Sequence, residues 1–378
     1  MSFSENAAGG GRGGGRGGGR GGGRGGGRGG GRGGGRGGGR GGGRGGGRGM
    51  AEDEGLVADA RLAIHDALAG YWDPPAGNNS FDWEPDALDL DYLPSDRRIE
   101  VILPQILARF GIEQGSTDGV PHVTLKCDGA KICTIQKPSL STLGTQMTWL
   151  RAYADLRADR AGEILLQAEE ITSAFSAVRP FDLPKRRHTY EMLILVHEVT
   201  ILLEQQIKHL MRSPRPVEFS DKVMPMIDTP PHSTYPSGHS TESFAIATAL
   251  SQLEYGETPG ESLAADRPTF HVAQRIAVNR TVAGVHYPVD SAAGAALGCA
   301  IGTAVAFIAN GTPLRSFGFD PNAAPEADFN RAALEPVIKG RASSKSPDPL
   351  AILQKRWLKA RGEWQRRDGR SGTTGTGS

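Results

Sequence analysis

Cysteine, aromatic residues and long apolar runs are all scarce in this chain of 378 residues. Its three cysteines, Cys127, Cys133 and Cys299, are odd in number, and their spacing fits neither a disulfide framework nor a tetrahedral zinc site. No segment combines a basic start with the apolar stretch of a secretory signal. These absences exclude a small disulfide-stabilised secreted domain, and they predict a soluble, cytoplasmic protein.

Only one stretch of the chain is apolar for long enough to cross a bilayer. Residues 291–310 contain no charged side chain, and about 20 residues is the length that a spanning helix needs. The stretch is dominated by Ala and Gly rather than by Leu or Ile, and no second stretch accompanies it. We therefore expect a helix buried inside a bundle and no membrane span.

The net charge of +1 conceals a strongly basic tail. Residues 1–49 hold ten Arg, at every fourth position from Arg12 to Arg48, with one Glu and 31 of the 55 glycines. A repeat without apolar side chains cannot form a core, so this tail is expected to be disordered. Its Arg residues could bind nucleic acid or another polyanion by releasing counterions, although it lacks aromatic residues that stack on bases. The alternative is a repeat without function, with Met50 as the true start.

Helical periodicity dominates the remaining sequence. The expected helices are 53–71, 100–110, several within 145–175, 188–211, 241–253, 270–285, 288–308 and 350–363. Two short apolar runs around Asp128 and Gly129, at 123–127 and 130–134, predict a hairpin with a tight turn. The expected fold class is therefore all-α, a helical bundle with a small β-hairpin before it.

This pattern predicts four segments. They are a disordered tail (1–49), a helical region with the hairpin (50–140), a catalytic bundle (141–320) and a C-terminal arm with a frayed end (321–378).

The tetrad Pro236-Ser237-Gly238-His239 opens an apolar helix. The first N–H groups of a helix have no intrahelical partner and attract anions. Ser237 and Gly238 could therefore hold an oxyanion while His239 transfers a proton. The alternative is a plain helix cap, because Ser is a favoured residue at that position.

Two more polar clusters lie at breaks between apolar helices. Lys208 and Arg215 lie where the 188–211 helix breaks, and Arg280, His286 and Asp290 lie where the 270–285 helix ends and the 288–308 helix begins. Each cluster alone could be an ordinary cap, since cations complement helix C-termini. Together they predict a bound polyanion, because an apolar bundle would not bury this much charge without one.

The three clusters, taken in order, resemble the motifs of a known superfamily. Lys-x6-Arg-Pro (208–216), Pro-Ser-Gly-His (236–239) and Arg-x5-His-x3-Asp (280–290) are similar to the motifs of vanadium-dependent haloperoxidases, acid phosphatases and type 2 phosphatidic acid phosphatases. The resemblance covers about residues 190–310. Asn279 stands where many members have Ser, next to the cation of the third motif.

The resemblance implies a role for each matching residue. The oxyanion-binding residues would be Lys208, Arg215, Ser237, Gly238 and Arg280. His286 would be the nucleophile on phosphorus or the ligand of vanadium in a bound vanadate, and Asp290 would fix its tautomer. His239 would be the general acid and base.

Two reactions fit these roles. A haloperoxidase would keep vanadate as its cofactor and oxidise halide, with bromide or iodide favoured, using hydrogen peroxide. A soluble, metal-free phosphatase would instead hydrolyse phosphate esters through a phosphohistidine at His286. His232 lies five residues before Ser237, an offset at which bromide- and iodide-oxidising members resemble this chain.

The offset of His232 makes the haloperoxidase the leading expectation and gives His232 a part in tuning the pocket or the halide preference. The phosphatase is the alternative, and an inactive polyanion-binding protein acting through the tail is the third. The sequence leaves the oligomeric state open.

Overall fold

The computed structural model describes residues 54–68, 86–181, 184–311, 313–343, 345 and 348–365. All of them belong to one unit of the chain by their contacts, residues 36–378. The predicted disordered tail, most of the Pro-rich segment before residue 86 and the predicted frayed end at 371–378 lie outside the described residues. The predicted boundaries at residues 140 and 320 stay a prediction.

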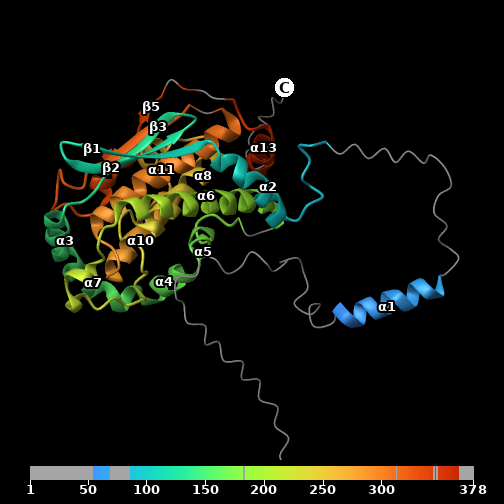
Figure 1. The fold of residues 1–378 in the computed structure, drawn as a ribbon, viewed down its shortest axis with the longest axis horizontal. Helices are drawn as coiled ribbons and strands as arrows, with labels where there is room; N and C mark the ends of the chain where they lie inside the picture. The colour runs from blue at the N-terminus through green and yellow to red at the C-terminus, as the bar shows by residue number, and fades with distance from the viewer. Residues whose placement is uncertain are drawn as a thin grey trace, which may run out of the picture. The chain divides into compact units, whose positions relative to one another are not determined.

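Two buried helices form the centre of the fold, α8 (Gly238–Glu254) and α11 (Pro288–Asn310). They pack against each other over more of their length than any other pair, and α6 (Arg187–Met211) and α10 (Pro268–Val282) pack on α8 (Figure 1). A helix that is apolar on every side is stable only when it is surrounded by other elements. The motif residues therefore lie at the ends of the most buried helices of the chain.

The structure describes further helices outside this centre. They are α1 (Glu54–Ala67), α2 (Ser95–Leu107), α3 (Leu140–Tyr153), α4 (Arg157–Glu169), α5 (Thr172–Ser176), α7 (Pro216–Phe219), α9 (Pro259–Ala264), α12 (Arg331–Ile338) and α13 (Ala351–Gln365). Three single 3-10 turns, at Ala154–Leu156, Pro184–Arg186 and Asp221–Val223, connect some of them. In Figure 1, α10 and α4 lie beside each other on the side of α8 and α11 away from the sheet.

A stripe of glycines explains the close contact of α8 with α11. A Cβ atom added to Gly294, Gly298 or Gly302 would lie 2.7, 2.2 and 2.8 Å from the nearest backbone oxygen of α8. Such distances are shorter than real Cβ contacts, so the two backbones touch where the glycines repeat every four residues. The Ala- and Gly-rich composition of residues 291–310 is thus a packing requirement.

The prediction of an all-α fold is wrong, because the structure contains a five-stranded mixed sheet. Its strands are β1 (Phe110–Thr117), β2 (Val120–Cys127), β3 (Ala130–Gln136), β4 (Arg315–Phe319) and β5 (Arg341–Ala342), in that order across the sheet. Antiparallel pairing joins β1, β2 and β3, whereas β3 and β4 are parallel, with Cys133 opposite Phe317. The sheet packs on α11 through β3 and β4.

The sequence pattern revealed only the part of the sheet with local pairing. The predicted hairpin is β2 and β3, joined at Asp128 and Gly129. Strand β1 is mostly exposed and lacks the apolar alternation of a half-buried strand, and the expected helix over 100–110 ends before it. Strand β4 has five residues, and its partner lies far away in the sequence. Its pairing depends on tertiary context rather than on local propensity.

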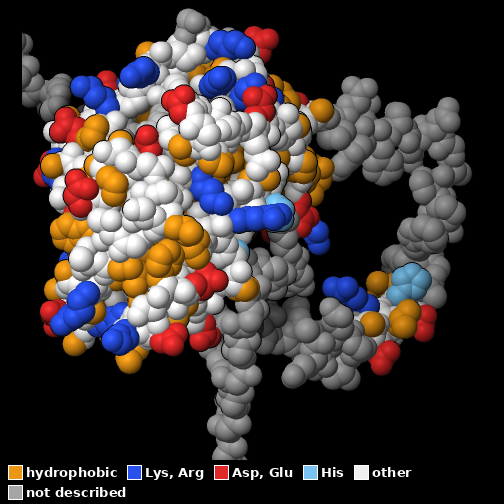
Figure 2. Space-filling view, turned by 60° about the vertical axis from the view of Figure 1, so that its left-hand side comes forward, with side chains coloured by type: hydrophobic (Ala, Val, Ile, Leu, Met, Phe, Trp, Pro, Cys, Tyr) orange, Lys and Arg blue, Asp and Glu red, His pale blue; other side chains and the backbone are white. Residues whose placement is uncertain are grey.

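Helix α11 is the one helix of the described chain with the length and composition to cross a membrane. Its apolar window is entirely buried inside the fold. Figure 2 shows that, on one face of the molecule, hydrophobic side chains gather in patches between charged side chains of both signs.

Candidate active site

The three motifs converge where α6 ends, α8 begins and α10 passes into α11. The side chains of Lys208, Arg215, Arg280, His286 and Asp290 are all nearly inaccessible to solvent. His232 and His239 are half-buried beside them. The structure thus brings together the residues that the sequence analysis selected from separate segments of the chain.

His286 and Asp290 form the best-defined pair of the site. His286 Nδ1 lies 3.0 Å from Asp290 Oδ2, which as a carboxylate can only accept, so Nδ1 carries the proton and Nε2 holds the lone pair. Asp290 Oδ2 also accepts hydrogen bonds from the Thr234 hydroxyl at 2.6 Å and from the Tyr287 backbone N–H at 3.0 Å. The i, i+4 spacing at the start of α11 therefore places a carboxylate behind the imidazole, which fixes its tautomer.

Burial controls the ionisation of both members of this pair. Desolvation, followed by the charges of Arg215 and Lys208, holds the pKa of His286 well below its usual value of 6.5. Desolvation also raises the pKa of the Asp290 carboxyl, against the hydrogen bonds from Thr234 and Tyr287 that lower it. His286 is therefore neutral near pH 7, the form in which Nε2 can act as a nucleophile or a ligand.

Arg215 lies directly beside the free nitrogen of His286. Its Nη1 is 3.1 Å from His286 Nε2 and donates to the Val285 carbonyl at 2.8 Å. Its Nη2 lies 3.1 Å from His232 Nδ1, and its Nε donates to the His232 carbonyl. Desolvation lowers the pKa of Arg215 to about 10, so the guanidinium remains charged near neutral pH.

Lys208 reaches the loop in front of the tetrad. Its Nζ donates to the carbonyl oxygens of Pro236, at 2.6 Å, and Ser233, at 3.3 Å. It therefore holds in place the segment that leads into the N-terminus of α8.

Arg280 has buried donors that an oxyanion could accept. Its Nη2 donates to the Ile164 carbonyl and to Gln167 Oε1, at 3.2 and 3.1 Å. Its buried Nε and Nη1 have no hydrogen-bond partner among the described residues. An unsatisfied buried donor costs roughly 1–3 kcal/mol, and more when it is charged, so an oxyanion at this position would remove a large penalty. Desolvation lowers the pKa of Arg280 to about 10, which leaves it charged near pH 7.

Ser237 begins α8 as its N-cap residue. The Ser237 hydroxyl accepts from the Ser240 backbone N–H at 3.5 Å, a long contact that leaves the oxygen available to another donor or acceptor. The plain helix cap and the oxyanion site are therefore compatible. Gly238 follows it with no side chain in the way, and the carboxylate of Glu204 lies against its Cα.

His239 has different neighbours from His286. Its Nε2 lies 3.0 Å from the Gln167 carbonyl on α4, whereas His286 contacts Thr234, Arg215 and Asp290. The charge of His239 is nevertheless among those that lower the pKa of His286, so the two imidazoles are near each other.

Sequence reasoning missed residues that hold the motif side chains in place. Thr234 lies between His286 and Asp290, and Gln167 accepts from both Arg280 and Asn279. Only tertiary structure reveals Gln167, which comes from a helix outside the three motifs. Thr234 carries a weak signal in the sequence, a small hydroxyl residue two positions before Pro236.

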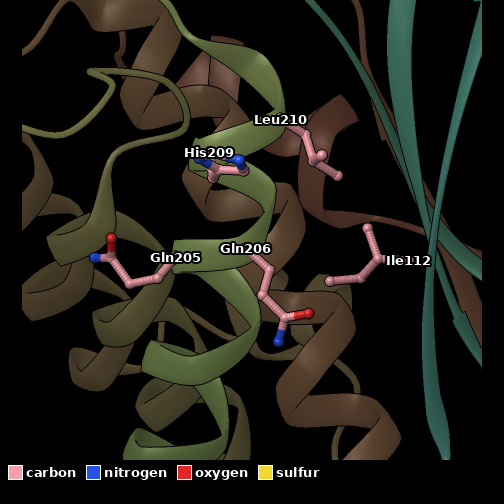
Figure 3. Close-up of a pocket in the computed structure, with 5 residues that line it drawn as sticks. All are labelled: Ile112, Gln205, Gln206, His209 and Leu210. Carbon is pink, nitrogen blue, oxygen red and sulfur yellow. The ribbon is translucent and has the colours of Figure 1, made fainter.

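Two surface cavities lie away from these residues. One of about 470 Å³ is lined by Ile112 of β1 and by Gln205, Gln206, His209 and Leu210 of α6 (Figure 3). The other, about 340 Å³, extends along the β1–β2 hairpin to Met211. None of the motif residues lines either cavity, so the chemistry of the site has to be inferred from the buried cluster itself.

Comparison with known proteins identifies the central segment. Residues 192–311 match the sequence model of the PAP2 superfamily. Two curated relatives from Mycobacterium tuberculosis, strains CDC 1551 and H37Rv, are each described as a decaprenylphosphoryl-5-phosphoribose phosphatase. Both are 32% identical to this chain over 133 residues, which is 34% of this chain and 66% of theirs, just under two thirds of their length.

One similar solved structure is a transmembrane PAP2 type phosphatidylglycerolphosphate phosphatase from Bacillus subtilis. It has a TM-score of 0.32 and 18% sequence identity, and the match covers 43% of this chain and 83% of that chain. This TM-score is too low to carry an argument about a shared fold.

Two expectations change. The curated relatives are named as phosphatases, so they support an enzyme of the phosphohydrolase type and favour the alternative over the haloperoxidase. The expectation of a soluble, cytoplasmic protein without a membrane span does not stand, because α11 has the length and composition to cross a membrane. The absences from which that location was inferred therefore do not decide it. All three motifs lie inside residues 192–311, the segment of the chain that matches the PAP2 superfamily.

Proposed function

We propose that this chain hydrolyses phosphate esters through a phosphohistidine at His286. The observation that carries the proposal is the pair of unsatisfied buried N–H groups of Arg280, in the same motif as a neutral histidine whose free nitrogen lies 3.1 Å from Arg215. A tetrahedral phosphate has oxygens for both guanidinium groups, for Lys208 and for the N-terminus of α8. The names of the relatives support the same chemistry.

In the first step, His286 Nε2 attacks phosphorus, and the bond from phosphorus to the leaving oxygen breaks. Asp290 stabilises the imidazolium character that develops, because it accepts the Nδ1 proton in a hydrogen bond of 3.0 Å. Arg215 Nη1 then transfers its hydrogen bond from Nε2 to a phosphoryl oxygen. His239 donates a proton to the departing alkoxide.

In the second step, water attacks the phosphohistidine, and the bond from nitrogen to phosphorus breaks. His239, now neutral, accepts a proton from that water, and inorganic phosphate leaves the site. Lys208, Arg215 and Arg280 stabilise the negative charge of both pentacoordinate transition states.

The same donors fit vanadate, which imitates the pentacoordinate state of phosphate. Vanadate would lie between Arg280, Arg215 and the N-terminus of α8, with vanadium at His286. In a phosphatase this makes vanadate an inhibitor rather than a cofactor. His232 then has no halide chemistry to tune, and its contact with Arg215 gives it the role of orienting the guanidinium.

We infer from the exposed apolar side chains near Tyr287 that the ester has an apolar leaving group. Tyr287 follows His286, and its ring contacts Phe219 of α7 edge to face at 6.3 Å between centroids. Phe219 is 38% exposed, and Met224, a few residues further on, is 69% exposed. The decaprenyl group in the name of the curated relatives is consistent with such a substrate.

The proposal is tested by assaying the purified full chain without added vanadate. We expect hydrolysis of p-nitrophenyl phosphate and of a polyprenyl phosphate, inhibition by vanadate, and no peroxide-dependent bromination after vanadate is added. Arg280→Ala should lose both hydrolysis and the thermal stabilisation by inorganic phosphate that a native-state ligand gives. Bromination without ester hydrolysis would reject the phosphatase in favour of the haloperoxidase.

The pH profile provides a second prediction. The pKa of His286 lies well below 6.5, and its neutral form is the nucleophile, so the rate should fall only as the pH drops through that depressed value. We expect kcat/KM to be maintained at pH 6.5 and its acid limb to lie well below it. An acid limb at or above pH 6.5 would contradict a buried, neutral nucleophile.

A further inference from the structure

A buried carboxylate that none of the motifs includes lies beside the proposed phosphate site. Glu204 is fully buried on α6, one helical turn before Lys208. A Cβ atom added to Gly238 would lie 2.7 Å from Glu204 Oε1 and 3.3 Å from Oε2. The carboxylate therefore lies against the first residue of α8, whose N–H is proposed to bind the phosphate.

Two cations of the site lie near Glu204. Residues four apart on a helix share a face, so Glu204 and Lys208 are neighbours, and the charge of Glu204 is among those that raise the pKa of Arg215 against its burial. A buried carboxylate is stable only when such cations neutralise it. In the free protein, Glu204 thus supplies negative charge at the site that the substrate phosphate would occupy.

The other titratable groups near this part of α6 belong to the site or to its border. Helices α6 and α8 contribute His197, His239 and Glu242, and the other motifs contribute His232, Arg280, His286 and Asp290. His197 Nε2 lies 2.9 Å from Glu242 Oε2. The cations of the other elements that pack on α6 have partners elsewhere. Arg98 of α2 and Arg356 of α13 pair with Glu191, which lies more than three helical turns before Glu204 on α6. Lys126 of β2 pairs with Glu113.

We propose that Glu204 is a positioning residue whose carboxylate neutralises Lys208 and Arg215 in the free protein. When phosphate binds, it takes over this neutralising role, so anion binding is coupled to protonation of Glu204. The proposal rests on the proposed function, because it assumes that phosphate binds at this cluster. A phosphate that enters brings a second negative charge close to a carboxylate that cannot move into water. When Glu204 takes up a proton, the repulsion between phosphate and the carboxylate is removed. When Glu204 stays charged, this repulsion weakens phosphate binding.

The test is the dissociation constant of inorganic phosphate, measured by calorimetry from pH 5 to pH 8.5 for the wild type and Glu204→Gln. At high pH, Glu204 is charged in the free wild type, and we expect the variant to bind phosphate at least about tenfold more tightly. The difference should shrink toward low pH, where a protonated Glu204 in the wild type would be as uncharged as the glutamine of the variant. A carboxylate with a purely structural role would instead weaken binding at every pH when replaced.

Three further variants make the result specific. Glu204→Met replaces the carboxylate with an apolar side chain of similar length, and we expect it to bind phosphate as tightly as Glu204→Gln. It also keeps the test possible if Glu204→Gln does not fold. Glu204→Asp keeps the charge and should keep the wild-type pH dependence. Glu191→Gln removes another buried carboxylate from α6, one whose partners are Arg98 and Arg356, and should leave that dependence unchanged.

The two proposals fail in different ways. Phosphate binding by the wild type with equal or weaker affinity in both neutral variants overturns the role of Glu204 and leaves the phosphatase in place. A wild type that does not bind phosphate at any pH overturns the phosphatase and, with it, the role of Glu204.

Discussion

Replacing His286 with alanine is expected to reduce phosphate-ester hydrolysis by at least about 10⁴-fold, because the nucleophile is removed and the covalent route is closed. The variant should keep its fold, since alanine leaves the buried segment at the start of α11 apolar. Steady-state kcat and an alkaline denaturing quench with labelled substrate are the measurements. The wild type should trap a phosphoenzyme that survives alkali and is lost on later treatment with acid, as a phosphohistidine is, and the variant should trap none.

Replacing His239 should give a different result. His239→Ala should still bind inorganic phosphate but should form the phosphoenzyme roughly 10²–10⁴-fold more slowly, because proton transfer to the leaving group is lost. The loss should be smaller for p-nitrophenyl phosphate, whose leaving group needs little protonation. His209→Ala, at an exposed histidine next to Lys208, is the matched control and should behave as the wild type.

For the His286→Ala variant, phosphoenzyme labelling at the wild-type level would assign the covalent step to another residue.

Gly298→Ala is expected to lower the free energy of unfolding by about 3 kcal/mol or more, the upper end of the cost of overpacking. The added methyl would lie 2.2 Å from the Thr241 carbonyl and 3.0 Å from the Ala245 backbone nitrogen, so α8 and α11 would have to separate. For a domain of this size, that loss corresponds to a fall in Tm of roughly 6–12 °C. Thermal unfolding followed by circular dichroism measures the change.

The control for this substitution is Gly162→Ala. Gly162 lies in the exposed part of α4, and nothing is within 4 Å of the position of its added Cβ. Alanine there should be neutral or stabilise by about 0.5–1 kcal/mol, because glycine loses more backbone entropy in a helix. Equal Tm values for Gly298→Ala and the wild type would show that α8 and α11 can move apart without cost.

The site was more predictable from the sequence than the fold around it. Lys208, Arg215, Ser237, His239, Arg280, His286 and Asp290 were all selected because charged and polar residues at breaks between apolar helices require a common partner. The structure places them in one cluster. The sequence predicted that these residues lie near one another. Their roles in the reaction stay proposals.

The residues that the sequence could not reveal act through tertiary contacts. Gln167 binds Arg280 and Asn279 from α4, and Glu204 meets Gly238 across the α6–α8 contact. Strands β1 and β4 were missed for a related reason, since one is largely exposed and the other pairs far along the chain. The choice of haloperoxidase rested on the offset of His232, whose contact with Arg215 is equally compatible with a phosphatase.

The parallel pairing of β3 with β4 has a consequence for the order of folding. Its register joins Cys133 to Phe317 and so closes a loop of about 180 residues that contains α6, α8, α10 and α11. A contact of such long sequence separation forms slowly, because the intervening chain must first become compact. During synthesis β3 emerges early and must wait for β4, so the edge of the β1–β3 meander stays open until the helices that carry the site have packed. Completion of the sheet would then be a late step that locks an already assembled helical centre.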